Sequence, residues 1–249
     1  LAFKLGRELG RYASRTRMCE VVLNGQYWGV YVFMEKVKRD NDRIDISRLN
    51  PDEISGDDLT GGYIIKLDKF EGGNSGDGWV SPYRPPFYMN SDQVIYFQYD
   101  YPANDRIVPQ QKGYIREYVT AFEDALRNKA LSDQVTGYKA FVDMNSFVDY
   151  AIVNEVSRNI DAYPLSTFLY KDKASVDGKL YIGPIWDYNL AFGNANYCDG
   201  SRTEGWAWDF NSICNGDFWL VPFWWQRFRS DPEFTETLSG RWTELRQGA

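Results

Sequence analysis

The order of the periodic segments constrains the fold more than any other feature of this sequence. Up to residue 108, apolar residues fall in short strand-like runs, and Asn24-Gly25 between two of these runs predicts a β-hairpin. From Pro109 onward, apolar residues repeat at helical spacing, as in 110–128 and 142–159. The order predicts one α+β domain, residues 1–249. Its β-rich amino lobe, 1–108, would share a cleft with a mainly helical carboxyl lobe, 109–249.

Local signals place several further elements. Residues 1–12 have the spacing of an amphipathic helix, and Asp143 has the position of a helix N-cap. The carboxyl-terminal stretch 221–248 is predicted to be helical. The aromatic residues of 206–210 and 217–225 are expected to lie in the core, with one or two exposed rings, rather than to form sugar-binding platforms. The glycine-rich segment 71–78 lacks the Gly-Lys-Ser/Thr ending of a phosphate-binding loop, so we interpret it as a flexible loop.

Composition excludes several classes of function. The chain has no histidine, which rules out Ser-His-Asp and Cys-His catalysis and any histidine-ligated zinc site. A bound metal would need oxygen ligands, which favours Mg, Mn or Ca. The net charge of −7 argues against general nucleic-acid binding. No apolar run approaches the ~20 residues of a membrane-spanning helix.

The three cysteines leave two alternatives open. Cys198 and Cys214 flank a loop-like stretch, and in an exported protein they would form a disulfide that leaves Cys19 as a buried thiol. The alternative is three reduced thiols in the core.

Two aspartates at the ends of one predicted hairpin are the main candidates for chemistry. Asp161 follows a predicted helix, and Asp187 lies in the sequence Trp-Asp-Tyr-Asn after the returning strand. Because antiparallel strands return to the same end, both carboxylates are expected at the mouth of the hairpin, near Asn159, Asn189 and Asn194. Asp187 is expected among buried neighbours and therefore to need a cation or a hydrogen-bond partner. The simpler alternative is that each aspartate only caps local backbone amides.

Two charged residues occur within strand-like runs of the amino half. Glu35 ends the run that follows the hairpin turn, where it could pair with Lys36 or Lys38 or bind a ligand in the cleft. Lys66 lies within the apolar run "GGYIIKLDKF", where it could reach a phosphate, pair with Asp68 or face solvent.

Several segments together resemble one known family. The sequence contains, in the family's order, "VVLNGQYWGVYVFMEKV", "RIDISRL", "GGYIIKLDK", "NEVSRNIDAY", "STFLYKD" and "GPIWDYNLAFGN". These motifs are similar to those of the spore coat protein H (CotH) kinase-like family and cover most of the chain. The resemblance implies an atypical protein-kinase fold and, from characterised members, phosphorylation of serine on secreted or surface proteins with ATP and a divalent metal. Many members of the family are exported domains of bacterial surface proteins.

The resemblance also implies roles for individual residues. Asp161 resembles the catalytic-loop aspartate that accepts the substrate hydroxyl proton, and Asp187 resembles the metal-binding aspartate of the kinase fold. Glu35 and the backbone after it would lie near the adenine. Glu8 is the candidate partner of the nucleotide-binding lysine, and Lys66 is a further candidate for nucleotide binding.

The sequence departs from the family pattern at two metal-ligand positions. Ser166 stands where kinases have a metal-binding asparagine, and Asn189 stands where the family often has a second aspartate. Both changes predict a weaker site for Mg or Mn. The strands that carry the phosphate-covering loop and its lysine are expected before Leu1, so the amino lobe of 1–249 is expected to be truncated at its start.

Three functions follow from these observations. The first is a metal-dependent phosphotransferase that uses ATP and acts on a hydroxyl of a secreted or cell-surface protein. The second is a pseudokinase-like surface module that keeps the fold but mainly binds partners. The third, a glycoside hydrolase using Asp161 and Asp187 as its carboxylate pair, has no motif of its own in the sequence.

Overall fold

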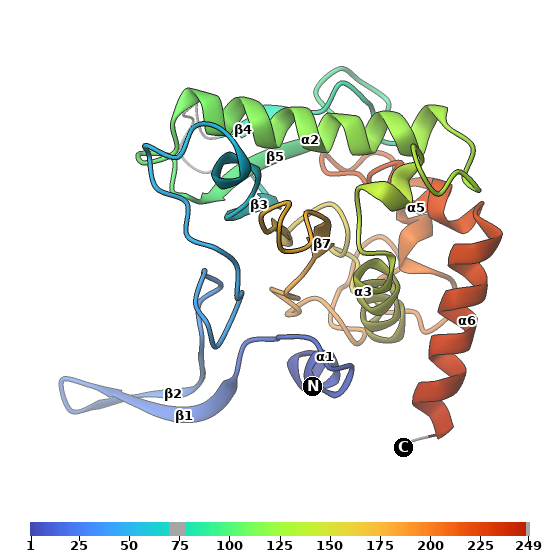
Figure 1. The fold of residues 1–249 in the computed structure, drawn as a ribbon. Coiled ribbons are helices and arrows are strands. Elements are labelled where there is room, and N and C mark those ends of the chain that lie inside the picture. The colour runs from blue at the N-terminus through green and yellow to red at the C-terminus, as the bar shows by residue number, and fades with distance from the viewer. Residues whose placement is uncertain (70–77, 248–249) are drawn as a thin grey trace.

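A computed structural model describes residues 1–69 and 78–247 (Figure 1). The described residues form six α-helices: α1 Ala2–Glu8, α2 Pro109–Asn128, α3 Met144–Ser157, α4 Phe210–Ile213, α5 Trp224–Arg229 and α6 Pro232–Gln247. The strands are β1 Thr16–Leu23, β2 Gln26–Met34, β3 Tyr63–Leu67, β4 Gly78–Val80, β5 Tyr96–Tyr101, β6 Thr167–Lys171 and β7 Leu180–Ile182. Three 3-10 helices complete the list: η1 Asp57–Thr60, η2 Tyr138–Ala140 and η3 Ala207–Asp209. This mixture of helices and sheets agrees with the predicted α+β class, whereas the division into two kinase-like lobes stays a prediction.

The predicted amino-terminal hairpin is present as β1 and β2. Asn24 and Gly25 both have left-handed backbone angles, φ 50° and 79°, which a two-residue turn of this kind requires. The hairpin extends away from the other described elements (Figure 1). Its apolar side chains are largely exposed, with Met18 at 71% and Phe33 at 73%. The helix predicted over residues 1–12 is shorter, because Gly10 adopts φ 81° soon after α1 ends.

A five-stranded antiparallel sheet in the order β4-β5-β3-β6-β7 lies at the centre of the molecule. Its first three strands come from the β-rich portion before residue 108, and β6 and β7 come from the portion after it. The sheet therefore crosses the boundary at residue 108 and joins the two portions through the β3–β6 pair.

Helices and aromatic side chains bury the sheet. Tyr114 of α2 stacks on Tyr63 of β3 with ring centroids 5.8 Å apart. Trp224 of α5 is fully buried against Phe97 of β5 and Phe122 of α2, as expected for the aromatic residues of 217–225. Trp206 and Phe218 are exposed rings, at 53% and 45%. Asp143 caps α3 by accepting a hydrogen bond of 2.7 Å from the Ser146 amide, as predicted.

The carboxyl-terminal stretch is not one continuous helix. It divides into α5 and α6 at Ser230–Asp231, immediately before Pro232. Proline has no amide hydrogen to continue α5 but fits the first turn of a new helix, and the Asp231 carboxylate accepts from the Glu233 amide at 3.0 Å.

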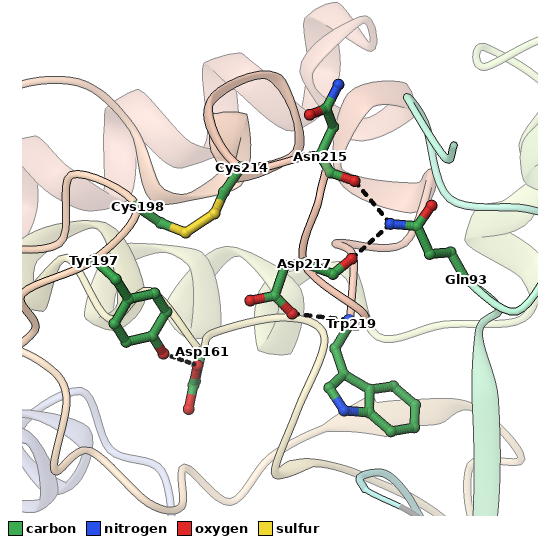
Figure 2. The surroundings of a disulfide bond; sticks show 8 residues. All are labelled: Gln93, Asp161, Tyr197, Cys198, Cys214, Asn215, Asp217 and Trp219. Carbon is green, nitrogen blue, oxygen red and sulfur yellow. Dashed lines mark hydrogen bonds between the residues drawn. A yellow bond between two sulfur atoms is a disulfide. The ribbon is translucent and has the colours of Figure 1, made fainter. Parts of the chain in front are cut away.

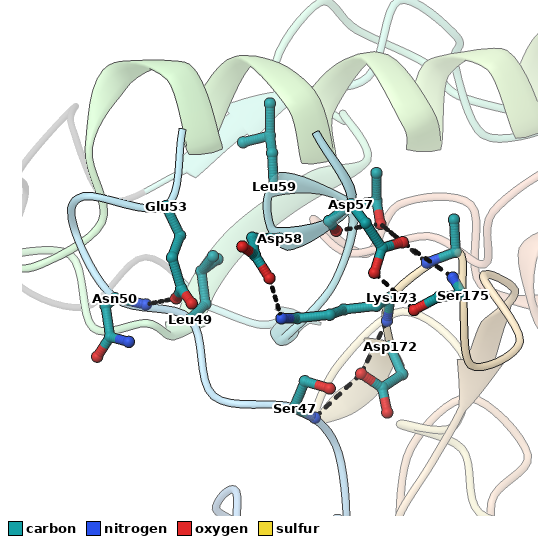
Figure 3. Close-up of polar contacts among 12 residues, drawn as sticks. Ser47, Leu49, Asn50, Glu53, Asp57, Asp58, Leu59, Asp172, Lys173 and Ser175 are labelled. Carbon is teal, nitrogen blue, oxygen red and sulfur yellow. Dashed lines mark hydrogen bonds and ion pairs between the residues drawn. The ribbon is translucent and has the colours of Figure 1, made fainter. Parts of the chain in front are cut away.

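The turn between β6 and β7 is fixed by the segment around η1 (Figure 3). Asp172 accepts hydrogen bonds from the amides of Ser47, at 3.0 Å, and Lys173, at 2.7 Å. Asp57 accepts from the amide and the hydroxyl of Ser175 at 2.9 and 2.5 Å. These contacts fix the turn that closes the β6–β7 hairpin. The open end of the hairpin, where β6 begins and β7 ends, is therefore held in place.

Candidate functional site

The register of three strands brings distant segments to the open end of the β6–β7 hairpin. Leu67 of β3 lies opposite Thr167 of β6, so the residues that follow β3 lie beside the loop that precedes β6. Leu169 pairs with Ile182 of β7, and the Gly183 amide donates to the Phe168 carbonyl at 2.8 Å. The segments that carry Lys69, Asp161 and Asp187 are therefore brought to the same end of the sheet.

Asp161 lies in the loop between α3 and β6. The Tyr197 hydroxyl donates a hydrogen bond of 3.1 Å to its Oδ1 atom. Burial raises the pKa of Asp161, the hydrogen bond from Tyr197 and the positive charge of Lys69 lower it, and the negative charges of Asp217 and Asp187 raise it further. Asp161 and Asp187 are thus close enough to act on each other electrostatically, and a raised carboxylate pKa suits a proton acceptor.

Asp187 is held between two anchored aromatic residues. Trp186 packs edge-to-face on Phe3 of α1 and Phe168 of β6, at 6.5 and 6.4 Å between ring centroids. On the other side, the Tyr188 hydroxyl donates to Asn154 Oδ1 of α3 at 2.6 Å. Asp187 itself has φ 57°, a left-handed angle that aspartate tolerates better than most residues.

The expectation that Asp187 is buried is wrong. Its side chain is exposed, because the left-handed turn directs it away from the two anchored rings. Ile185 is buried, but Trp186 and Leu190 are half-buried and Phe192 is 45% exposed. Asp187 consequently needs no partner within the protein and is available to solvent and ligands.

Left-handed backbone angles concentrate around this site. The non-glycine residues that adopt them between residues 158 and 199 are Arg158, Tyr163, Ser166, Asp187, Phe192, Cys198 and Asp199. Elsewhere in the described residues, only Asn24 and Phe87 do so. Such angles are costly for residues with a side chain and commonly cluster where function requires a particular geometry.

The other two predicted metal ligands lie on the same segments. Ser166 is half-buried and immediately precedes β6, with φ 50°. Asn189 is exposed two residues after Asp187, and its backbone carbonyl accepts a hydrogen bond of 2.7 Å from the Asn194 side chain. The donors here are carboxylate, amide and hydroxyl oxygens, and the carboxylates repel one another. That chemistry fits a hard divalent cation such as Mg or Mn.

The predicted nucleotide-binding residues have other partners in the protein. The Glu35 carboxylate accepts from the Arg15 backbone amide at 3.0 Å and from Arg15 Nε at 2.8 Å, and Arg43 Nε lies 3.6 Å away. The hydrogen bonds from Arg15 lower the pKa of Glu35 to about 2. Glu35 therefore pairs with these two arginines rather than with the neighbouring Lys36 or Lys38.

Lys66 forms an ion pair with Asp68, with 3.1 Å between Nζ and Oδ2. Both Lys66 and Lys36 lower the pKa of the half-buried Asp100, although burial raises that pKa overall. Lys36, the residue after Glu35, thus acts electrostatically on Asp100 of β5. Glu8 is exposed at the end of α1, and no side-chain hydrogen bond or ion pair joins its carboxylate to another residue in 1–69 or 78–247. The glycine-rich segment 71–78 lies almost entirely in the part that the structure does not describe.

The structure joins Cys198 and Cys214 in a disulfide beside Asp161 (Figure 2), with 5.4 Å between their Cα atoms. A carboxylate oxygen of Asp217 lies within 4.8 Å of both sulfur atoms. Because the sulfurs are bonded to each other, they are not thiolate ligands for a metal. Cys19 is a free thiol on β1, but it is half-exposed rather than buried as expected.

Sequence reasoning missed three residues of this site, namely Lys69, Tyr197 and Asp217. The last two belong to loops without hydrophobic periodicity, so only their closeness to the cysteines at 198 and 214 could have marked them. Lys69 follows β3 directly, and its approach to Asp161 depends on the β3–β6 register.

Comparison with protein families gives the same assignment as the motifs. The model of the family described as CotH kinase protein matches residues 1–249, the whole length of the sequence. The chain belongs to the CotH kinase protein family. No curated protein matches it. As a CotH family member it is kinase-like, and the family points to ATP and a divalent metal as ligands. Within the described residues of this CotH protein, no helix combines the length and the apolar character that a membrane span requires.

Proposed function

We propose that this CotH family member is a metal-dependent phosphotransferase that moves the γ-phosphoryl group of ATP to a hydroxyl group. The acceptor would be a serine, threonine or other hydroxyl on a secreted or cell-surface bacterial protein. The observation that carries the proposal is the strand register, which brings the segments of half-buried Asp161 and exposed Asp187 to the same end of the β6–β7 hairpin. Kinase catalysis uses one carboxylate to accept a proton and another to hold metal.

Each residue has a separate task in this proposal. Asp161 accepts the proton of the attacking hydroxyl, and Tyr197 and Lys69 stabilise its ionised form. Asp187, Asn189 and Ser166 would hold Mg or Mn, and the bound metal would neutralise charge on the phosphate oxygens. Because Ser166 and Asn189 are neutral, Asp187 supplies the single negative charge of these three ligands.

The proposed nucleotide contacts take account of the partners that the candidate residues already have in the protein. The Glu35 carboxylate is occupied by Arg15 and Arg43, so the segment after β2 would contact adenine through its backbone. Lys66, half-buried beside Asp68 and Asp100, would direct its positive charge toward the phosphates. For Glu8, pairing with the nucleotide-binding lysine stays a prediction from the family pattern alone.

The disulfide supports export of the protein. Disulfides persist mainly in oxidising surroundings such as the bacterial periplasm or the cell exterior. The Cys198–Cys214 bond is therefore consistent with a secreted or cell-surface location.

Thermal unfolding with MnCl₂ or MgCl₂, each with and without ATP, tests the proposed site. We expect a rise in melting temperature that needs metal and ATP together, is lost in Asp187→Ala, and is retained in Asp161→Asn. Asp105→Ala is the matched control, because Asp105 is an exposed carboxylate four residues after Tyr101, which pairs with Ile64 at the other end of β3 from Leu67. If wild type shows no joint effect of metal and ATP, the phosphotransferase proposal fails and the pseudokinase-like binding module becomes the better explanation.

A further inference from the structure

Tyr197 is hydrogen-bonded to Asp161, the candidate proton acceptor, and it immediately precedes a cysteine of the disulfide. Its hydroxyl donates to Asp161 Oδ1 at 3.1 Å, and the following residue, Cys198, is bonded to Cys214 (Figure 2). Burial and the negative charge of Asp161 raise the pKa of Tyr197 to about 12, so its hydroxyl stays protonated and remains a donor. No described side chain donates to the other oxygen, Oδ2, which leaves that atom available to a substrate hydroxyl.

The chain around Tyr197 has little regular structure to hold it. Residues 183–206, all of them described, contain no helix and no strand. Cys198 and Asp199 both adopt left-handed backbone angles, φ 48° and 58°. Near Tyr197, the disulfide adds a covalent connection to the hydrogen bond that the Arg158 side chain donates to the Asp199 carbonyl at 3.3 Å.

The other half of the disulfide is firmly anchored. Cys214 directly follows α4, where the buried Asn211 side chain accepts from the Val221 amide at 2.7 Å and donates to the Val221 carbonyl at 2.9 Å. Beyond Cys214, the Gln93 side chain donates to the carbonyls of Asn215, at 2.7 Å, and Asp217, at 2.5 Å (Figure 2). The disulfide thus ties Cys198, and with it Tyr197, to the fixed segment around Cys214.

Asp217 places a negative charge in the same cluster. Its Oδ1 atom accepts from the Trp219 amide at 2.9 Å, which fixes the carboxylate within 4.8 Å of both sulfurs. Its charge acts on Tyr197 and on Asp161. Movement of this segment would therefore alter both the hydrogen bond and the electrostatic surroundings of the proposed proton acceptor.

We propose that Tyr197 is a positioning residue for Asp161 and that the Cys198–Cys214 disulfide holds it in place, so that phosphoryl transfer depends on the oxidised protein. The inference rests on the function proposed above. Tyr197 selects one orientation of the Asp161 carboxylate, with Oδ2 directed to the acceptor. Reduction by a dithiol breaks the S–S bond, places two electrons and two protons on the sulfurs as thiols, and converts the dithiol to its own disulfide.

Steady-state kinetics test the positioning role. In Tyr197→Phe we expect kcat to fall about tenfold or more while KM for ATP is unchanged, because displacement of a reacting group lowers catalysis without removing binding contacts. The double variant Cys198→Ser/Cys214→Ser should give the same fall. When these changes are combined with Tyr197→Phe, kcat should not fall further, since both act through one hydrogen bond. Tyr181→Phe is the matched control, because the Tyr181 hydroxyl donates to Asp177 at the far end of the hairpin.

Amide hydrogen exchange over residues 159–165 gives a readout that does not need activity. The Ala162 amide donates to Asn159 at 3.0 Å and the Leu165 amide donates to Asp161 at 3.3 Å, so both report on the loop. Dithiothreitol should speed their exchange in wild type and have no further effect in Tyr197→Phe. Cys19→Ser should respond as wild type, which assigns the effect to the disulfide.

The two proposals fail in distinguishable ways. An inactive wild type whose loop exchange still responds to reduction overturns the phosphotransferase function and leaves the structural coupling intact. Unchanged loop exchange on reduction, or wild-type kcat in Tyr197→Phe, overturns the positioning proposal. If kcat is normal in the double cysteine variant but low in Tyr197→Phe, Tyr197 still positions Asp161 and the proposed role of the disulfide is overturned.

Discussion

Leu67 of β3 lies directly opposite Thr167 of β6, and this register places the end of a strand from the β-rich portion beside the loop that contains Asp161. The consequence is chemical as well as structural, because the positive charge of Lys69, two residues beyond Leu67, acts on Asp161. Residues separated by about 90 positions in the sequence therefore share one site, and the sheet that joins them is part of the catalytic proposal.

Replacing Lys69 with methionine should shift the pH dependence of phosphoryl transfer. Lys69 lowers the pKa of Asp161, so its removal raises that pKa. A proton acceptor must be ionised, and activity is lost as pH falls through its pKa. The acid limb of the kcat profile should therefore move to higher pH, by a fraction of a unit for an exposed charge. Lys129→Met, an exposed lysine beyond the end of α2, should leave the limb in place, and an equal movement in both variants would contradict the assignment.

Replacing Tyr188 with phenylalanine should weaken both stability and metal binding. The variant loses the 2.6 Å hydrogen bond to Asn154. Because Asn154 is fully buried, its Oδ1 atom is left without a donor. Loss of one partner from a buried polar pair costs about 1–3 kcal/mol. Because Tyr188 also anchors Asp187, the affinity for Mn in the presence of ATP should fall. Urea unfolding and calorimetric titration measure the two effects, and Tyr27→Phe on the exposed hairpin serves as the control.

Stability should depend on pH through Glu123, a carboxylate fully buried in α2. Its oxygens accept from Ser81 Oγ at 2.7 Å and from Trp224 Nε1 at 2.9 Å, yet burial raises its pKa from 4.5 to about 7. The folded protein thus favours the protonated form. This contribution to stability is complete below pH 4.5, decreases above it and is lost as pH rises through 7.

Glu123→Gln mimics the protonated carboxyl group and isolates that effect. Its free energy of unfolding should match wild type near pH 4.5 and exceed it by roughly 3 kcal/mol above pH 7, at about 1.4 kcal/mol per pH unit. Urea unfolding followed by tryptophan fluorescence at several pH values measures the difference. A difference that does not change with pH would show that folding does not shift the pKa of Glu123.

Local sequence signals predicted the local structure well. Asn24-Gly25 gave the hairpin because few other residue pairs adopt two left-handed angles, and Asp143 gave the start of α3 because its side chain caps a free amide. The antiparallel pairing of β6 and β7 followed from one short turn between two strand-like runs. In each case a few neighbouring residues determine the geometry.

The errors and omissions arose where tertiary structure decides. Asp187 was expected to be buried because its neighbours are apolar, but a left-handed turn directs it outward. Pro232 divides a stretch whose apolar spacing alone suggested one helix. Tyr197 and Asp217 reach the site on irregular loops held by a disulfide and by Gln93, contacts that no periodic pattern encodes.

The central claim is that Asp161 and Asp187 together perform phosphoryl transfer, and transfer itself tests it most directly. Wild type, Asp161→Asn and Asp187→Asn are incubated with γ-labelled ATP, MnCl₂ and casein as a hydroxyl-bearing acceptor. Mass spectrometry then locates phosphate on casein and on the chain itself. With wild type we predict phosphate on hydroxyl side chains. In both variants the rate of labelling should fall at least a hundredfold. Asp161→Asn should still bind ATP, whereas Asp187→Asn should not. Wild type that binds ATP with metal yet labels no hydroxyl, or Asp161→Asn that labels as well as wild type, would contradict the claim.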